Sequence, residues 1–164
     1  MIYKKIEKTD DKIIKELADF AEGIWHEHYD PLLGEAQVTY MVDMFQSEKA
    51  IKDQFEHGYN YYMVCTEEGE NAGFMGYYLR EKDLYLSKFY LHKDYRGKGI
   101  SKDMMAFMKE RTKEAGFTSF ELNVNKYNDA VKAYEKLGLK RVGEEVIDIG
   151  EGYVMDDYVY RCEV

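Results

Sequence analysis

The chain has few cysteines, a single proline and no long apolar run, and each scarcity excludes a class of protein. Cys65 and Cys162 are the two cysteines, and their separation gives neither a C-x-x-C pair nor a zinc-ligand spacing. We therefore expect two buried thiols and no metal site. No apolar segment approaches the length needed to cross a membrane, and residues 1–6 lack the apolar core of a signal peptide. These absences predict a cytoplasmic protein with no membrane partner.

The chain also has fewer basic than acidic residues. The 23 Lys and Arg residues are outnumbered by 32 Asp and Glu residues, which gives a net charge of −9. A general nucleic-acid binder needs a basic face, so we expect no nucleic-acid partner. The acidic balance suits a cationic small substrate better. Sixteen Tyr and eight Phe residues are enough to build both a core and the walls of a pocket, and the length predicts one domain over residues 1–164.

Apolar periodicity predicts an α+β fold built on a mixed sheet. Strands are expected at residues 2–6, 59–65, 73–79, 84–91, 119–124, 139–149 and 153–162. Helices are expected at residues 10–20, 35–57, 100–115 and 128–137. A break in the second helix is indicated near Ser47, and Pro31 is expected to end the helical segment before it.

Residues 95–102 follow the expected fourth strand and open a helix. The segment combines two glycines, which allow close approach of a ligand to the backbone, with three basic residues. These residues are Gly97, Gly99, Arg96, Lys98 and Lys102. We expect no acidic residue in the first helical turn, which would leave its N–H groups open to a phosphate or pyrophosphate. By itself the pattern is equally consistent with a tight turn carrying solvated basic residues, and it matches neither a Walker sequence nor a dinucleotide-binding fingerprint.

Two motifs together point to a family. The run Arg96-Gly97-Lys98-Gly99-Ile100-Ser101 resembles the coenzyme A pyrophosphate loop of the GCN5-related N-acetyltransferases, whose pattern is Arg/Gln-x-x-Gly-x-Gly/Ala. Residues 128–139 resemble the family's Asn…Ala…Tyr-Glu-Lys-x-Gly-Phe segment, with Leu139 in place of Phe. Two motifs in the family's order are far more specific than either alone. The resemblance implies about seven mostly antiparallel strands, with splayed central strands, and about four helices.

The same resemblance implies an activity and a set of residues that carry it. An acetyl group passes from acetyl-CoA to a primary amine by direct attack on the thioester. Tyr134 would donate a proton to the departing thiolate, and backbone N–H groups near Tyr90 would stabilise the oxyanion. The residues implied to bind the cofactor are Phe89, Tyr90, Leu91, Arg96, Gly97, Lys98, Gly99, Ile100, Ser101, Asn128 and Lys136.

The acceptor is predicted less directly. In the family, the helices after the first strand form the acceptor-side wall, so the candidate substrate-binding residues are Trp25, Tyr29, Tyr40 and Met41. Aromatic core packing is the alternative for each of them. The runs Leu86-x-Lys88-x-Tyr90 and Val154-Met155-Asp156-Asp157-Tyr158 resemble members that acetylate polyamines or other small amines.

The resemblance therefore suggests a small-molecule amine, with a polyamine as the first candidate. The alternatives are a protein N-terminus or lysine as acceptor, or a non-catalytic module that binds acyl-CoA. The group that deprotonates the amine stays open among Asp83, Glu121 and a water chain. A homodimer is common in the resembled family and is a candidate assembly, although the sequence itself does not specify the oligomeric state.

Overall fold

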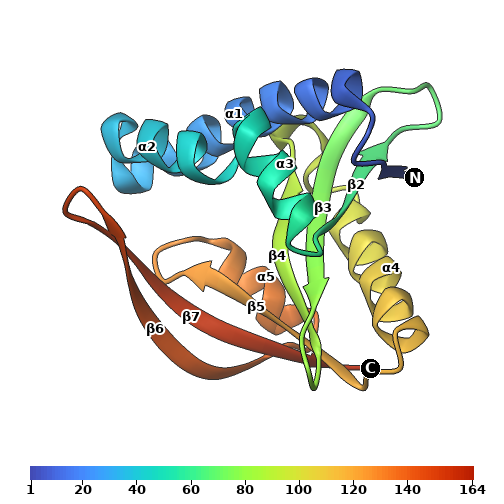
Figure 1. Ribbon diagram of the computed structural model, residues 1–164. Coiled ribbons are helices and arrows are strands. Elements are labelled where there is room, and N and C mark those ends of the chain that lie inside the picture. The colour runs from blue at the N-terminus through green and yellow to red at the C-terminus, as the bar shows by residue number, and fades with distance from the viewer. The chain divides into compact units, whose positions relative to one another are not determined.

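The computed structural model describes all 164 residues and confirms an α+β fold with seven strands and five helices (Figure 1). In chain order the elements are β1 (Ile2–Ile6), α1 (Asp11–Leu33), α2 (Glu35–Phe45), α3 (Glu48–Glu56), β2 (Asn60–Cys65), β3 (Asn71–Leu79), β4 (Leu84–Leu91), α4 (Ile100–Glu114), β5 (Ser119–Asn125), α5 (Ala130–Lys136), β6 (Lys140–Gly150) and β7 (Tyr153–Glu163). The chain forms two compact units, one of Met1–Tyr78 with Lys88–Asp103 and the other of Leu79–Ser87 with Met104–Val164.

The first unit contains three helices and the antiparallel strands β1, β2 and β3, with the second half of β4 beside β3. Within this unit, α2 and α3 both pack against α1, and these helices form the blue and cyan group in Figure 1. Its core contains large side chains that are almost fully buried, including Leu17, Ile24, Tyr61 and Phe74. In this unit the second half of β4 is an edge strand, so its outer backbone groups have no neighbouring strand within the unit.

The second unit contains β5, β7 and β6 in that order, all antiparallel, with the first half of β4 beside β5. The β4–β5 pairing is parallel and is confined to Leu84 with Phe120 and Tyr85 with Glu121. The long β6–β7 hairpin is the red ribbon in Figure 1. Phe120 and Tyr160 are fully buried in this unit. The short parallel ladder agrees with the expectation that the central strands splay apart.

One expected helix break is present in the structure, and another is not. The break near Ser47 is real: its side chain accepts a hydrogen bond from the N–H of Ala50 at 3.1 Å and caps α3, so the region holds two helices and the total is five. The expected break at Pro31 is wrong, because α1 continues to Leu33. Pro31 lies in the last turn of α1, and because proline has no N–H, this turn loses a single backbone hydrogen bond. Gly34 follows the helix, and its N–H donates to the carbonyl of Asp30.

Both cysteines are buried, as expected from their isolation in the sequence. None of the helices combines the length and the apolar character that crossing a membrane would require.

Candidate functional site

The loop before α4 has the backbone of an anion-binding turn. A 3-10 turn at Lys93–Tyr95 follows β4, and Gly97 and Gly99 then adopt positive φ values of 76° and 78°. Nothing lies within 4 Å of a Cβ added at either glycine, so the left-handed backbone, and not a lack of space, requires glycine here. The N–H groups of residues 97–99 donate to no backbone carbonyl, and the first N–H groups of a helix also lack intrahelical acceptors. A run of unused donors therefore faces outward at the start of α4.

The Arg96 side chain is committed to protein contacts. Its guanidinium donates to both carboxylate oxygens of Glu27 on α1, at 3.4 and 3.2 Å, and to the carbonyl of Leu91 at 3.2 Å. Its backbone N–H donates to Lys93. Arg96 thus connects the loop to α1 through an ion pair, whereas Lys98 and Lys102 have no carboxylate partner among the ion pairs of the structure.

The expectation that the first turn of α4 carries no acidic residue is wrong. Asp103 lies in that turn, and it accepts a hydrogen bond from the hydroxyl of Tyr3 on β1. Burial and the neighbouring carboxylate raise the pKa of Tyr3 well above its ordinary value, so the hydroxyl stays a donor. The Asp103 carboxylate is therefore used to attach α4 to the first strand.

The residues expected to hold the pantetheine arm lie at the end of β4. Leu91 is buried, and Phe89 and Tyr90 are half-buried. Their backbone belongs to the part of β4 that is an edge strand in the first unit, which is the arrangement that an extended amide-containing ligand can join as an added strand. Tyr90 comes so close to β3 that a Cβ added to Gly73 would lie 2.4 Å from its carbonyl oxygen.

An aromatic cluster brings two of the four predicted acceptor-wall residues together with Tyr90. Trp25 and Tyr29 of α1 are buried, with ring centroids 5.4 Å apart, and the Trp25 ring lies 5.5 Å from that of Tyr90. The hydroxyls of Tyr29 and Tyr90 are hydrogen-bonded at 3.1 Å. The indole N–H of Trp25 is buried and has no hydrogen-bond acceptor. We refer to Trp25, Tyr29, Phe45 and Tyr90 as the aromatic cluster.

The other two predicted acceptor-wall residues lie on α2. Met41 is buried, and its sulfur accepts a hydrogen bond from the side-chain amide of Gln37 at 3.8 Å. Tyr40 is half-buried. Of the four predicted acceptor-wall residues, Trp25 and Tyr29 are therefore members of the aromatic cluster, whereas Tyr40 and Met41 are not.

Lys88, to which the sequence analysis gave no role of its own, is buried among the rings of the aromatic cluster. It is 5% exposed, and its Nζ lies over the rings of Trp25 and Phe45, 5.2 and 5.3 Å from their centroids. No carboxylate pairs with it, and burial lowers the pKa of its amine to about 7. Gly76 makes room for it, because a Cβ there would lie 3.0 Å from the Lys88 Cγ. The sequence contained one sign that this lysine is buried, because Lys88 lies on the same face of β4 as Leu84, Leu86 and Tyr90.

The second predicted motif lies in the second unit. Tyr134 on α5 is 8% exposed, with its ring 6.3 Å from that of Tyr160. Asn128 is buried, and its Oδ1 accepts from the N–H of Ala130, the first residue of α5, at 2.9 Å. The N-cap position itself is Asp129, one residue later than the sequence suggested, and its side chain makes no capping bond. Lys136 is exposed in the last turn of α5.

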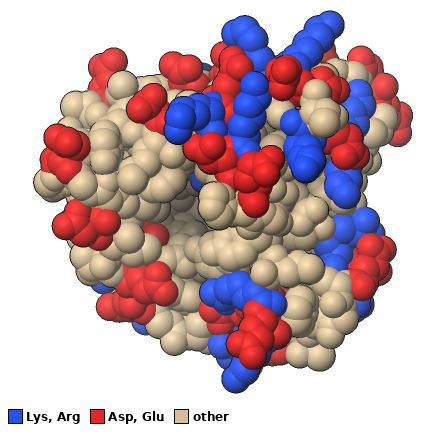
Figure 2. Space-filling view, in the orientation of Figure 1, with Lys and Arg blue, Asp and Glu red and all other residues tan.

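The two carboxylates considered as proton acceptors are both occupied. Arg80 donates to both oxygens of Asp83 at 2.6 Å and to Glu121 at 3.0 Å, and Arg161 donates to Glu121 at 2.6 and 2.9 Å. Basic and acidic side chains lie together over this β3–β4 turn at the bottom of Figure 2. Ion pairs of this kind hold a carboxylate in its charged form and hinder its use as a base.

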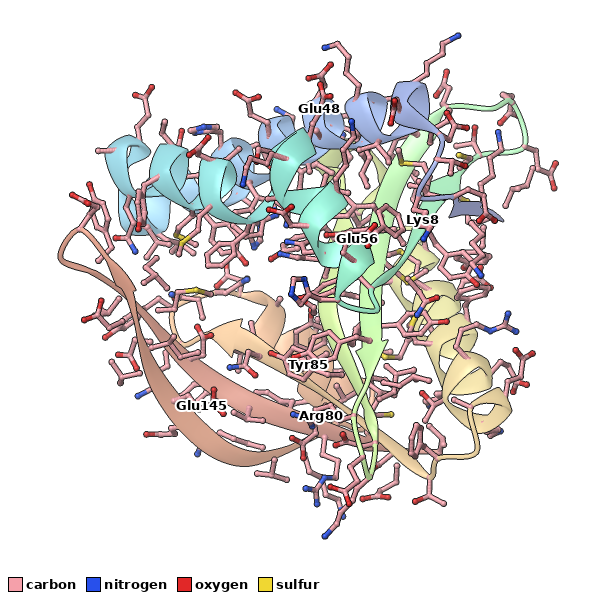
Figure 3. The ribbon with its side chains drawn as sticks, in the orientation of Figure 1. Lys8, Glu48, Glu56, Arg80, Tyr85 and Glu145 are labelled. Carbon is pink, nitrogen blue, oxygen red and sulfur yellow. The ribbon has the colours of Figure 1, made fainter.

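A polar row crosses the sheet of the second unit near this arginine pair. The Tyr85 hydroxyl on β4 donates to Asn123 on β5 at 2.7 Å, and the Asn123 amide donates to Glu145 on β6 at 3.1 Å and to Asp157 on β7 at 3.4 Å. Arg80, Tyr85 and Glu145 are labelled in Figure 3. Asp157 is 2% exposed, and burial, with the nearby charges of Glu145 and Asp156, raises its pKa to about 6. We refer to Tyr85, Asn123, Glu145 and Asp157 as the polar row.

Comparison with known proteins decides the family. Residues 29–154 match the family model described as an acetyltransferase (GNAT) domain. The chain belongs to the GNAT acetyltransferase family. A curated relative, the uncharacterized N-acetyltransferase YdgE of Bacillus subtilis (strain 168), is 26% identical over 103 residues, which cover 57% of this chain and 66% of that protein.

Solved structures with the same fold include two with coenzyme A. The PaiA N-acetyltransferase of Thermoplasma acidophilum in complex with coenzyme A has a TM-score of 0.75 at 16% identity, with all of both chains covered. An aminoglycoside 6'-N-acetyltransferase complexed with coenzyme A has a TM-score of 0.68 at 14% identity, covering 99% of this chain and 97% of that one. At these identities the likeness establishes the GNAT fold.

As a GNAT acetyltransferase, the protein is an N-acetyltransferase that uses acetyl-CoA as the acetyl donor. Acetyl transfer requires hydrogen-bond donors for the phosphates of acetyl-CoA, a binding site for the acceptor amine, and side chains that transfer protons. The loop at residues 97–102 supplies unused N–H groups, and the aromatic cluster surrounds the Lys88 amine. Tyr134 and the polar row lie in the second unit. The sequence analysis predicted site roles for the loop, Trp25, Tyr29 and Tyr134. It quoted Lys88 and Asp157 within the two runs that resemble small-amine acetyltransferases, and it did not single out Asn123 or Glu145.

Proposed function

We propose that the acetyl group is transferred to the primary amine of a small molecule, with a polyamine as the first candidate. The aromatic cluster carries this proposal. Its rings already accommodate an alkylammonium, because the Lys88 Nζ lies within 5.3 Å of the Trp25 and Phe45 centroids. Aromatic faces attract cations in this way, and amine ligands use the same interaction. The net charge of −9 also favours the approach of a cationic substrate.

In the proposed reaction the amine attacks the thioester carbonyl directly. The loop at residues 96–101 and the end of β4 hold acetyl-CoA, and Asn128 and Lys136 are further candidate contacts. Backbone N–H groups near Tyr90 stabilise the tetrahedral oxyanion. Tyr134 donates a proton to the departing thiolate, a transfer for which the ordinary pKa values of phenol and thiol, about 10 and 8.5, are well matched.

Two buried donors favour a second candidate within the class of small amines. The Trp25 indole N–H has no acceptor, and the Lys88 amine has no carboxylate partner. An acceptor molecule that carries a carboxylate besides its amine, such as an amino acid, would satisfy both donors. A second ammonium group would instead be repelled by Lys88 in its charged form.

A panel assay separates these acceptors. The purified protein is incubated with acetyl-CoA and with spermidine, spermine, amino acids, aminoglycosides or a lysine-containing peptide, and thiol release is followed together with product mass. Turnover of spermidine or spermine supports the polyamine assignment, and turnover of amino acids alone replaces it with the second candidate. If the peptide alone is acetylated, the acceptor is a protein and the small-amine proposal is wrong.

The proposal also includes a homodimer and a cytoplasmic location, which rest on the family resemblance and the composition. Analytical ultracentrifugation at micromolar protein, with and without coenzyme A, tests the first, and fractionation of the native cells tests the second.

A further inference from the structure

A cavity of about 330 Å³ lies among the first three helices. Its lining comes from α1, from α2 and from the start of α3, so all of it belongs to the first unit. No residue of the loop at 96–101 and no member of the aromatic cluster lines it. The cavity has the size of a small-ligand site, and it is separate from the groups assigned to acetyl transfer.

Gln46 is the most deeply buried residue of the lining. It follows the last turn of α2, it is 0% exposed, and neither the oxygen nor the nitrogen of its side-chain amide has a hydrogen-bond partner. Because both atoms are unpaired, one donor and one acceptor are unused whichever way the amide is oriented. Burial of unpaired polar atoms is costly, so an amide of this kind in a cavity wall indicates that a ligand supplies the partners.

The same cavity is lined by acidic side chains from all three helices. These are Asp19 and Glu22 on α1, Asp43 on α2 and Glu48 on α3, the last of which is labelled in Figure 3. Asp19 pairs with Lys15 at 3.4 Å, and the other three belong to none of the ion pairs of the structure. The lining contains no lysine or arginine, and its histidine, His26, has its Nδ1 2.8 Å from the Asp30 carboxylate. The cavity therefore attracts a cation.

An organic cation fits this lining better than a metal ion does. A metal site needs several ligands that converge, and the chain contains no group of three or more His, Cys, Asp or Glu side chains that could hold one. Ala18 and Val42 add buried apolar surface to the wall. Such surface suits the methylene groups of an aliphatic cation.

We propose that this cavity binds a small aliphatic cation that also carries a neutral amide group. The cationic end is attracted by the carboxylates, and the methylene groups contact the apolar wall. The amide N–H donates to the Gln46 oxygen, and the amide oxygen accepts from the Gln46 nitrogen. A fully protonated polyamine has donors only and would leave that nitrogen unpaired. This inference is independent of the acceptor proposed for acetyl transfer.

Isothermal titration calorimetry at low ionic strength tests the ligand class, with argininamide as the probe. Agmatine keeps the guanidinium, the methylene chain and the amine and lacks the amide, whereas norvalinamide keeps the amide and lacks the guanidinium. Argininamide is expected to bind at least about tenfold more tightly than either compound, because each lacks one of the two recognised groups. Added salt should weaken the binding of argininamide and agmatine more than that of norvalinamide.

Variants of the lining test the location. Gln46→Leu removes both unpaired polar atoms and should therefore be at least as stable in urea as the wild type. It should weaken argininamide binding at least about tenfold and change agmatine binding less than about twofold. The double variant Glu22→Gln with Asp43→Asn should weaken both compounds at least about fivefold and reduce the effect of salt. Glu56→Gln, an exposed change on α3 outside the lining, is the control and should match the wild type.

Three results would overturn the inference. The first is no saturable binding of argininamide at millimolar concentration. The second is wild-type affinity for argininamide in either Gln46→Leu or the double variant, because the compound would then bind elsewhere, as it would at the acceptor site. The third is tighter binding of spermidine than of argininamide, because the amide would then have no role. These measurements contain no acetyl-CoA, so their outcome is separate from whether any amine is acetylated.

Discussion

Replacement of Lys88 by methionine should stabilise the protein, by an amount that depends on pH. Burial lowers the pKa of the Lys88 amine from 10.5 to about 7, and no carboxylate compensates for the buried charge. At about 1.4 kcal/mol for each pH unit, this difference corresponds to roughly 5 kcal/mol of lost unfolding free energy when the amine is charged. Cation–π contacts with Trp25 and Phe45, at about 0.5–2 kcal/mol, are smaller than this penalty.

The sign of the pH dependence follows from the lowered pKa. Between pH 7 and 10.5 the unfolded chain binds the proton that folded Lys88 has lost, so wild-type stability rises with pH over this window. Below pH 7 both states are protonated and the full penalty applies. Lys88→Met should therefore be more stable by about 3–5 kcal/mol at pH 6, and this advantage should shrink by about 3 kcal/mol at pH 9.

Urea unfolding at pH 6, 7.5 and 9 measures these differences without changing ionic strength. Lys12→Met, an exposed lysine on α1, is the matched control and should show no pH-dependent difference from the wild type. A stability difference between Lys88→Met and wild type that stays constant from pH 6 to 9 would refute the reasoning, because it would mean that Lys88 titrates at its ordinary pKa. A destabilised Lys88→Met would show that lost packing outweighs the buried charge.

Three other changes test the loop, the thiolate donor and the β3–β4 contact. Gly99→Glu should weaken acetyl-CoA binding more than tenfold, which is at least about 1.4 kcal/mol by calorimetry. Gly99→Ala carries the same backbone strain without the charge and should lose less acetyl-CoA affinity. Equal losses of affinity in the two variants would argue against an anion at this loop. Tyr134→Phe should retain acetyl-CoA affinity while kcat falls at least about 100-fold, and an unchanged kcat would remove Tyr134 from the mechanism. Gly73→Ala should lower the unfolding free energy by about 1–3 kcal/mol, because its Cβ would meet the Tyr90 carbonyl at 2.4 Å, whereas Gly143→Ala, which meets nothing within 4 Å, should be nearly neutral.

Most of the local structure could be predicted from the sequence, because periodicity and capping residues act over a few positions. The strand at Leu84–Leu91 and the helix break near Ser47 lie where the pattern placed them. Pro31 was misjudged because its effect depends on how many residues follow it in the helix, and the sequence does not show where α1 ends. Asp103 was missed because an error of a few residues in the start of α4 moves it into or out of the first turn.

The sequence by itself determined the family and the loop, because Gly97, Gly99 and the segment at residues 128–139 specify local backbone and appear in the order typical of GNAT acetyltransferases. Tertiary structure alone decided which charges are free. It pairs Arg96 with Glu27, buries Lys88 against Trp25, and gathers the polar row from four strands. These outcomes depend on which distant residues meet and on how much water they exclude, and neither quantity is contained in a local pattern.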